Sequence, residues 1–175
     1  MSCVKAQRWS PPPDGILKIN TDGSFRKTSH TGGWGFTIRN TEGNLIAAGA
    51  GNLEYVSDAL HAEAQAMLHA AIIASQMGCQ SVMFETDSAL LKQAVTTDDY
   101  NLSSLASMFR EIKFHLRVGF NDVKVVFCPR ACNGAAHSLA AHGVTMEVGH
   151  YETWLGQFPE FVKDVVAGDV SSMLS

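Results

Sequence analysis

The alternation of apolar and polar residues predicts three β-strands near the start of the chain. From Leu17 to Asp22 the side chains alternate with a period of two, and Gly23 is expected to end this strand. Residues 32–39 and 45–53 form the next two predicted strands, separated by a short segment rich in Asn and Gly. Three strands with such short connections favour an antiparallel meander.

Helical periodicity dominates the following residues, interrupted by two apolar runs. Apolar side chains at three- and four-residue spacing predict a helix between an N-cap at Ser57 and a terminal glycine at Gly78. Further helices are expected at 88–95, 102–118 and 132–143, a buried strand at 82–87 and a fifth strand at 123–127. This order predicts an α/β fold with a mixed five-stranded sheet, in which parallel crossovers follow the meander and helices flank both faces.

Composition divides the chain into three parts. The prolines Pro11–Pro13 favour an extended conformation, so residues 1–14 are predicted to form an N-terminal arm. Residues 15–146 form the domain, and residues 147–175 form an acidic C-terminal tail to which no structure is assigned. The tail holds five acids and one base and so carries the whole net charge of −4. The chain therefore lacks the basic excess of a tight, non-specific nucleic-acid binder.

The remaining composition is that of an ordinary globular protein. The hydrophobic fraction is 46% and the charged fraction 17%, which excludes a disordered or fibrous class. No apolar run reaches the roughly 18 residues of a membrane helix, and no signal peptide is recognisable. The four cysteines form no CxxC pair and are interpreted as free thiols in a reducing compartment. We expect an intracellular monomer, cytoplasmic or nuclear, with no membrane association.

Three carboxylates fall at positions that favour a shared site. Asp22 ends the first strand on its polar side, Glu63 lies at the margin of a buried helical stripe, and Asp87 ends an apolar strand. Each alone has a structural explanation, as a turn residue, a rim residue or an N-cap. Together they would repel each other and raise each other's pKa, and a bound cation would remove that penalty. Oxygen ligands suit Mg²⁺ or Mn²⁺ better than zinc.

Five segments, in order, resemble segments of ribonuclease H domains. They are Leu17–Phe25 (LKINTDGSF), Gly32–Phe36 (GGWGF), His61–Ala66 (HAEAQA), Glu85–Ser88 (ETDS), and Pro129–Asn133 with Ala136–Ala140 (AHSLA). Over residues 16–143 the chain is similar to the type 1 ribonuclease H family. It most resembles the reverse-transcriptase-like, retroelement-derived domains of plants.

The resemblance implies a metal-dependent endonuclease that hydrolyses the RNA strand of RNA–DNA hybrids and leaves 5′-phosphate and 3′-hydroxyl ends. Family members hold two Mg²⁺ ions with four carboxylates, of which Asp22, Glu63 and Asp87 are three. His137 stands where the fourth acid is expected. Imidazole suits Mn²⁺ better than Mg²⁺, so a liganding His137 predicts stronger activity with Mn²⁺. Two other interpretations stay open: a polar residue at the rim of the site, or a proton shuttle.

The resemblance also implies a set of substrate-binding residues. Backbone groups at Gly23 and Ser24 are expected to meet ribose 2′-hydroxyls, because in the family this position distinguishes RNA from DNA. Arg26 is placed to contact the scissile strand, and Asn133 completes the set. The alternative function is a catalytically impaired, retroelement-derived module for nucleic-acid binding or interaction. His137 and the absence of a basic excess favour this alternative.

Overall fold

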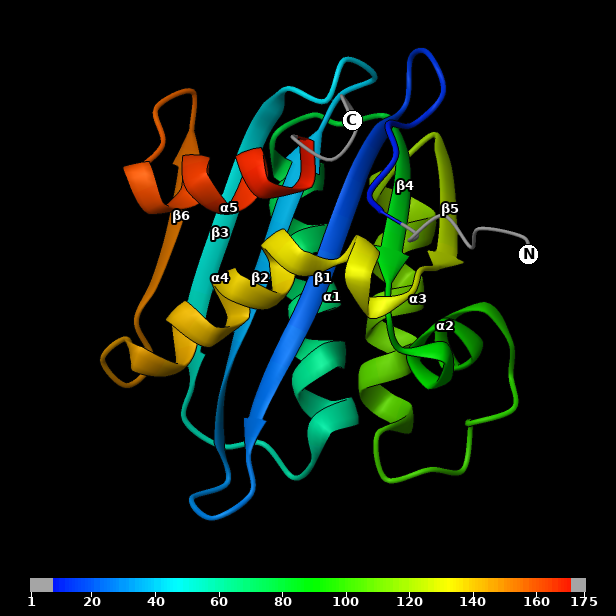
Figure 1. Ribbon diagram of the computed structural model, residues 1–175. Helices are drawn as coiled ribbons and strands as arrows, with labels where there is room; N and C mark the ends of the chain where they lie inside the picture. Colours follow the sequence, from blue (N-terminus) through cyan, green and yellow to red (C-terminus); the bar gives the residue numbers. More distant parts are fainter. Residues whose placement is uncertain (1–7, 171–175) are drawn as a thin grey trace, which may run out of the picture.

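A mixed six-stranded sheet forms the centre of the computed structural model, which describes residues 8–170 (Figure 1). The strand order is β5-β4-β1-β2-β3-β6. The meander comprises β1 (Leu17–Arg26), β2 (Thr31–Arg39) and β3 (Leu45–Leu53), which pair antiparallel. The strand β4 (Ser81–Thr86) pairs in parallel with β1, and β5 (Asp122–Phe127) pairs in parallel with β4. The predicted α/β fold, with a meander followed by parallel crossovers, is confirmed.

Helices cover both faces of the sheet (Figure 1). Behind it, α1 (Ala59–Gln76) packs on β1 and β2, and α3 (Ala106–Gly119) packs on α1 with α2 (Ala89–Thr96) beside it. In front, α4 (Gly134–Thr145) crosses β1, β2 and β3 and contacts α5 (Glu160–Val170). A single 3₁₀ turn, Arg130–Cys132, leads into α4.

The glycines of β2 explain how α4 packs so closely on the sheet. Trp34 and Phe36 point to the α1 face and are buried in its core. Gly33 and Gly35 point to the other face, where an added Cβ would lie 2.3 Å from the carbonyl oxygen and 2.5 Å from the amide nitrogen of Ala140, respectively. The alternation of glycine and aromatic residues therefore supplies side chains to one core and lets the α4 backbone contact the strand directly.

Several element boundaries differ from the sequence prediction by a few residues, and three of these differences have a clear physical reason. The strand β1 continues past Gly23 to Arg26, because the hairpin with β2 keeps both strands paired. The N-cap of α1 is Asp58 rather than Ser57, and its carboxylate accepts a hydrogen bond from the amide of His61 at 2.8 Å. The helix α3 begins at Ala106, four residues later than predicted, because residues 97–105 form turns instead of a helical first turn.

The predicted number of strands was wrong, because part of the acidic tail joins the sheet. The strand β6 (Tyr151–Leu155) pairs antiparallel with β3, and five residues are too few to produce a clear alternating pattern. The helix α5 follows, and its Asp169 accepts a hydrogen bond from Arg39 Nη1 at 2.9 Å and another from the backbone of Ala135. That second bond caps the start of α4. Residues 171–175 of the predicted tail lie outside the described residues.

The described part of the N-terminal arm packs against the sheet. Trp9 is buried, and its ring lies over the guanidinium of Arg39 at 3.9 Å. Residues 1–7 of the arm, including Cys3, lie outside the described residues. The other three cysteines are free thiols, as expected. Within residues 8–170, no helix is both long enough and apolar enough to cross a membrane.

Candidate metal centre

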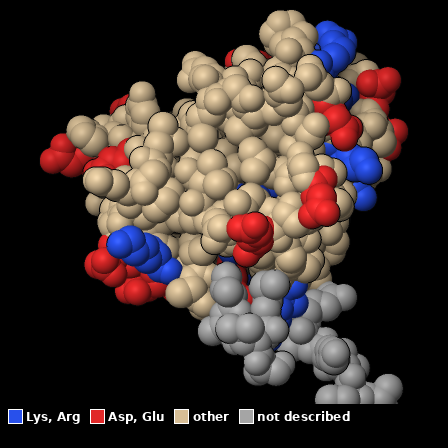
Figure 2. All heavy atoms as spheres, turned by 90° about the horizontal axis from the view of Figure 1, so that it is seen from above, with Lys and Arg blue, Asp and Glu red and all other residues tan. Residues whose placement is uncertain are grey.

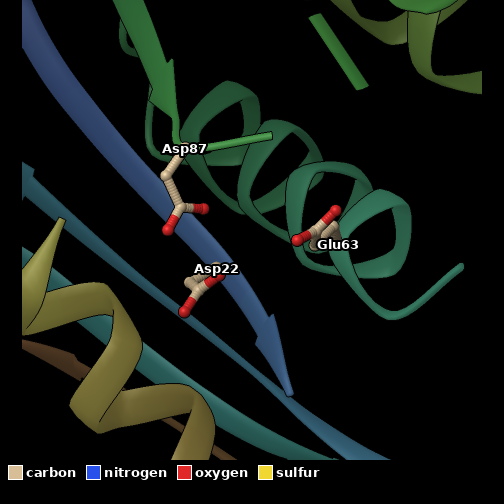
Figure 3. A group of neighbouring side chains, drawn as sticks. All are labelled: Asp22, Glu63 and Asp87. Carbon is tan, nitrogen blue, oxygen red and sulfur yellow. The ribbon is translucent and has the colours of Figure 1, made fainter. Parts of the chain in front are cut away.

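The three predicted acids meet where the sheet opens beside β1. The β1–β4 ladder ends at the pair Asn20 and Glu85, so the part of β1 that follows has no strand on that side. Asp22 lies on this unpaired part, Asp87 follows the end of β4, and Glu63 comes from α1 behind the sheet (Figure 3). One carboxylate oxygen from each acid lies within 4.8 Å of the other two. The sequence prediction that they converge is therefore confirmed in geometry.

Gly23 brings α1 close enough for Glu63 to reach the other acids. A Cβ added at Gly23 would lie 2.3 Å from the carbonyl carbon of Ala62 and 2.4 Å from the amide nitrogen of Glu63. Any other residue would force the helix away from the strand. The Asp-Gly pair thus supplies one acid directly and positions a second one through backbone contact.

Burial and mutual repulsion raise the pKa of two of the acids. The pKa of Asp22 rises from 3.8 to about 6, chiefly through burial and then through the charge of Asp87, while His137 acts in the opposite direction. The pKa of Glu63 rises to about 7, chiefly through burial and also through the charges of Asp22 and Asp87. A divalent cation would relieve both penalties. Three carboxylates that face a common position form a donor set that fits Mg²⁺ or Mn²⁺.

His137 contacts the acid group from α4. Its Nδ1 lies 2.9 Å from Oδ2 of Asp22, and its side chain is half exposed. The imidazole does not belong to the group whose candidate ligand atoms lie within 4.8 Å of one another. The role of His137 as a metal ligand stays a prediction. In the structure its direct partner is Asp22, which is itself a candidate metal ligand.

The predicted substrate-binding residues fall into two kinds of environment. Ser24 is half buried, two residues beyond Asp22, and Arg26 is exposed at the end of β1. Gly23 lies against α1. Asn133, by contrast, is completely buried and bonds to Asn20 and to the carbonyl of Thr21. Contact of Gly23, Ser24 and Arg26 with substrate stays a prediction, whereas the burial of Asn133 leaves it no surface for such contact.

Two residues near the acids were missed as site residues. Ser88 caps α2 through the amide of Leu91, and its side chain also hydrogen-bonds to Glu63. The sequence identified Ser88 only as a cap. Arg130 places a positive charge near Glu63 and lowers the pKa of that acid in opposition to burial. Arg130 belongs to a segment that carries the family resemblance, so its position there was the available signal.

A family model described as reverse transcriptase-like matches residues 20–143, a range that includes all three acids. The chain belongs to this family. The sequence resemblance to reverse-transcriptase-like ribonuclease H domains is therefore confirmed, whereas the plant and retroelement origin stays a prediction. A search of curated proteins gave no match.

Solved structures of ribonuclease H1 share the fold of this reverse-transcriptase-like domain. The enzyme of the archaeon Halobacterium salinarum is 25% identical, with a TM-score of 0.63 over 74% of this chain and 98% of its own. LC11-RNase H1, isolated from compost, is 23% identical, with a TM-score of 0.64 over 74% of this chain and 95% of its own. LC9-RNase H1 is 16% identical, with a TM-score of 0.63 over 93% and 87% of the two chains.

Proposed function

We propose that this chain is a divalent-metal-dependent endonuclease of ribonuclease H type that hydrolyses the RNA strand of RNA–DNA hybrids. The observation that carries the proposal is the convergence of Asp22, Glu63 and Asp87 within 4.8 Å, with the pKa of two of them raised. LC11-RNase H1, which has the same fold, has been crystallised in complex with an RNA/DNA hybrid. The relative's substrate class is the one we assign to this chain.

The side chains around the acids have distinct roles in this proposal. Asp22, Glu63 and Asp87 would hold Mg²⁺ or Mn²⁺, which when bound supplies Lewis-acid stabilisation of the phosphodiester. Ser88 orients Glu63 through its hydrogen bond. His137 holds one oxygen of Asp22.

Substrate contacts would come from the residues beyond Asp22. The backbone at Gly23 and Ser24 would meet the ribose 2′-hydroxyls. Arg26 is exposed at the strand end and would contact a phosphate of the cleaved strand. Asn133 would act on substrate only through the residues that it holds, because it has no exposed surface.

A cleavage assay on an end-labelled hybrid tests the proposal. Wild-type protein and Asp22→Asn are compared in Mg²⁺ and in Mn²⁺, with Asp164→Asn as a matched control at an exposed position of α5. We expect the wild type and the control to cut the RNA strand and leave 5′-phosphates, and Asp22→Asn to be inactive. A wild type that cuts in neither metal refutes the proposal. Cleavage that survives in Asp22→Asn assigns the activity to another site or to a contaminant.

A second candidate function is a binding module that has lost catalysis. His137 supports it, because imidazole brings no negative charge to the position of the fourth acid. On the face seen from above, acidic and basic side chains are scattered around an uncharged area (Figure 2). Hybrid binding without cleavage by the wild type, and cleavage by His137→Asp, would favour this candidate.

A further inference from the structure

A buried hydrogen-bond network centred on Asn20 lies next to the acid site along β1. Asn20 precedes Asp22 by two residues on the same side of β1 and is fully buried. Its Nδ2 donates to Oε1 of Glu85 at 2.9 Å and to Oδ1 of Asn133 at 3.1 Å. Its Oδ1 accepts a hydrogen bond from the indole Nε1 of Trp9 at 3.0 Å. One amide group therefore joins β1 to three other parts of the chain.

Two of these partners lead directly to site residues. Glu85 lies on β4, two residues before Asp87. Asn133 is the N-cap of α4, and its carbonyl accepts a hydrogen bond from the amide of His137 at 3.0 Å. The side chain of Asn133 also donates to the carbonyl of Thr21, next to Asp22, at 2.9 Å. The separation of Asp22, Asp87 and His137 thus depends on bonds that meet at Asn20.

The third partner, Trp9, comes from the segment that precedes the predicted domain. Its ring is fixed on the guanidinium of Arg39 at 3.9 Å. A second tie runs through Lys18, whose Nζ donates to the carbonyl of Ser10 at 2.6 Å and pairs with Glu85 at 3.2 Å. Because the Trp9 indole can only donate, it fixes Oδ1 of Asn20 toward itself and directs Nδ2 toward Glu85 and Asn133. Loss of that donor would leave a buried acceptor unpaired and free the amide to rotate.

We propose that Trp9 and Asn20 are positioning residues of the acid site, so that the segment around Trp9 belongs to the functional unit and is not a linker. Trp9 orients the Asn20 amide, and Asn20 holds β4 and the start of α4 against β1. The carboxylates then sit at the spacing that a metal requires. This inference rests on the proposed function, because it concerns the metal site on which that function depends.

The variant Trp9→Phe isolates the hydrogen bond. It keeps an aromatic ring near Arg39 and removes the donor to Asn20, at the cost of a small cavity where the larger indole was buried. The matched control is Trp154→Phe, the same change on β6, where the ring packs against Phe161. Asn20→Ala is the stronger perturbation, and because it can impair folding, the conclusion rests on Trp9→Phe. The measurements are Mn²⁺ affinity by electron paramagnetic resonance, kcat and KM for a hybrid, and urea unfolding.

We expect Trp9→Phe to weaken Mn²⁺ affinity about tenfold, the lower end of the usual effect of residues that support metal ligands. Its kcat should fall while its KM for the hybrid is unchanged, because Trp9 is buried and offers no surface to substrate. Trp154→Phe should leave Mn²⁺ affinity at the wild-type value. A Trp9→Phe protein that loses stability but binds Mn²⁺ like the wild type would overturn the positioning role. A wild type that binds no Mn²⁺ would instead overturn the proposed function.

Discussion

Replacing Asp22 by asparagine should stabilise the metal-free protein at alkaline pH, although it removes a residue of the proposed site. Folding raises the pKa of Asp22 from 3.8 to about 6, and the side chain is almost fully buried. The ionised carboxylate is therefore less stable in the native state than in the unfolded chain. A shift of about two pKa units corresponds to roughly 3 kcal/mol of unfolding free energy. The favourable contact with His137 is already included in that shift, so this value is the net penalty.

The sign of the effect fixes its pH dependence. Above about pH 6 both states carry the ionised Asp22, and the full penalty lowers the stability of the native state. As the pH falls through 6 the native state takes up a proton first, and the penalty shrinks. Below about pH 4 the unfolded chain is also protonated, and no penalty is left. Asparagine is neutral at every pH, so the advantage of the variant should exist at pH 8 and disappear at pH 4.

Urea unfolding in EDTA at pH 8 and at pH 4 measures this difference. We expect Asp22→Asn to be more stable than the wild type by about 3 kcal/mol at pH 8 and equal to it at pH 4. Asp164→Asn, an exposed change of the same chemistry, should match the wild type at both. Excess Mn²⁺ should narrow or reverse the order at pH 8, because only an intact acid group gains binding energy. A metal-free Asp22→Asn no more stable than the wild type at pH 8 would refute the reasoning.

Three further predictions concern the same site. Mn²⁺ affinity, measured by calorimetry, should rise about twentyfold from pH 6 to pH 8, because Asp22, with a pKa of about 6, and Glu63, with a pKa of about 7, must both be ionised to bind the ion. An affinity that does not change with pH would contradict those pKa values. Gly23→Ala should push α1 away from β1, which lowers the unfolding free energy by about 1–3 kcal/mol and weakens Mn²⁺ binding. A variant with unchanged thermal unfolding and unchanged Mn²⁺ affinity would disprove this prediction. His137→Asp should raise cleavage in Mg²⁺ relative to cleavage in Mn²⁺, and an unaltered ratio would count against His137 as a ligand.

The acid site could be predicted from the sequence because local patterns determine each of its parts. Strand alternation puts Asp22 on the polar side of β1, the helical stripe puts Glu63 at its margin, and the end of an apolar run locates Asp87. Their convergence then follows from the order of the elements. The sequence could not show how close α1 comes to β1, because that distance depends on the backbone contact at Gly23.

The two ends of the chain could not be predicted in the same way. Trp9 bonds to Asn20 across the proline run, and Asp169 pairs with Arg39 across 130 residues of sequence. Neither contact produces a local period, and the family model, which spans residues 20–143, excludes Trp9 and Asp169. The proline-rich start of the chain was interpreted as an arm and its acidic end as a tail, because composition was the available signal there. In the structure both segments supply partners to Arg39, a buried charge on the sheet.

The position of His137 narrows its three candidate roles, which are metal ligand, polar residue at the rim and proton shuttle. Its Nδ1 is occupied by Oδ2 of Asp22 at 2.9 Å, so that nitrogen cannot bind a metal while the contact lasts. The Asp22 carboxylate also accepts a hydrogen bond from the backbone of Gly23, so His137 is not its sole partner. The contact with His137 also lowers the pKa of Asp22, which burial and the charge of Asp87 raise. In this geometry the imidazole favours the ionised form of Asp22, which is the form that a cation would require.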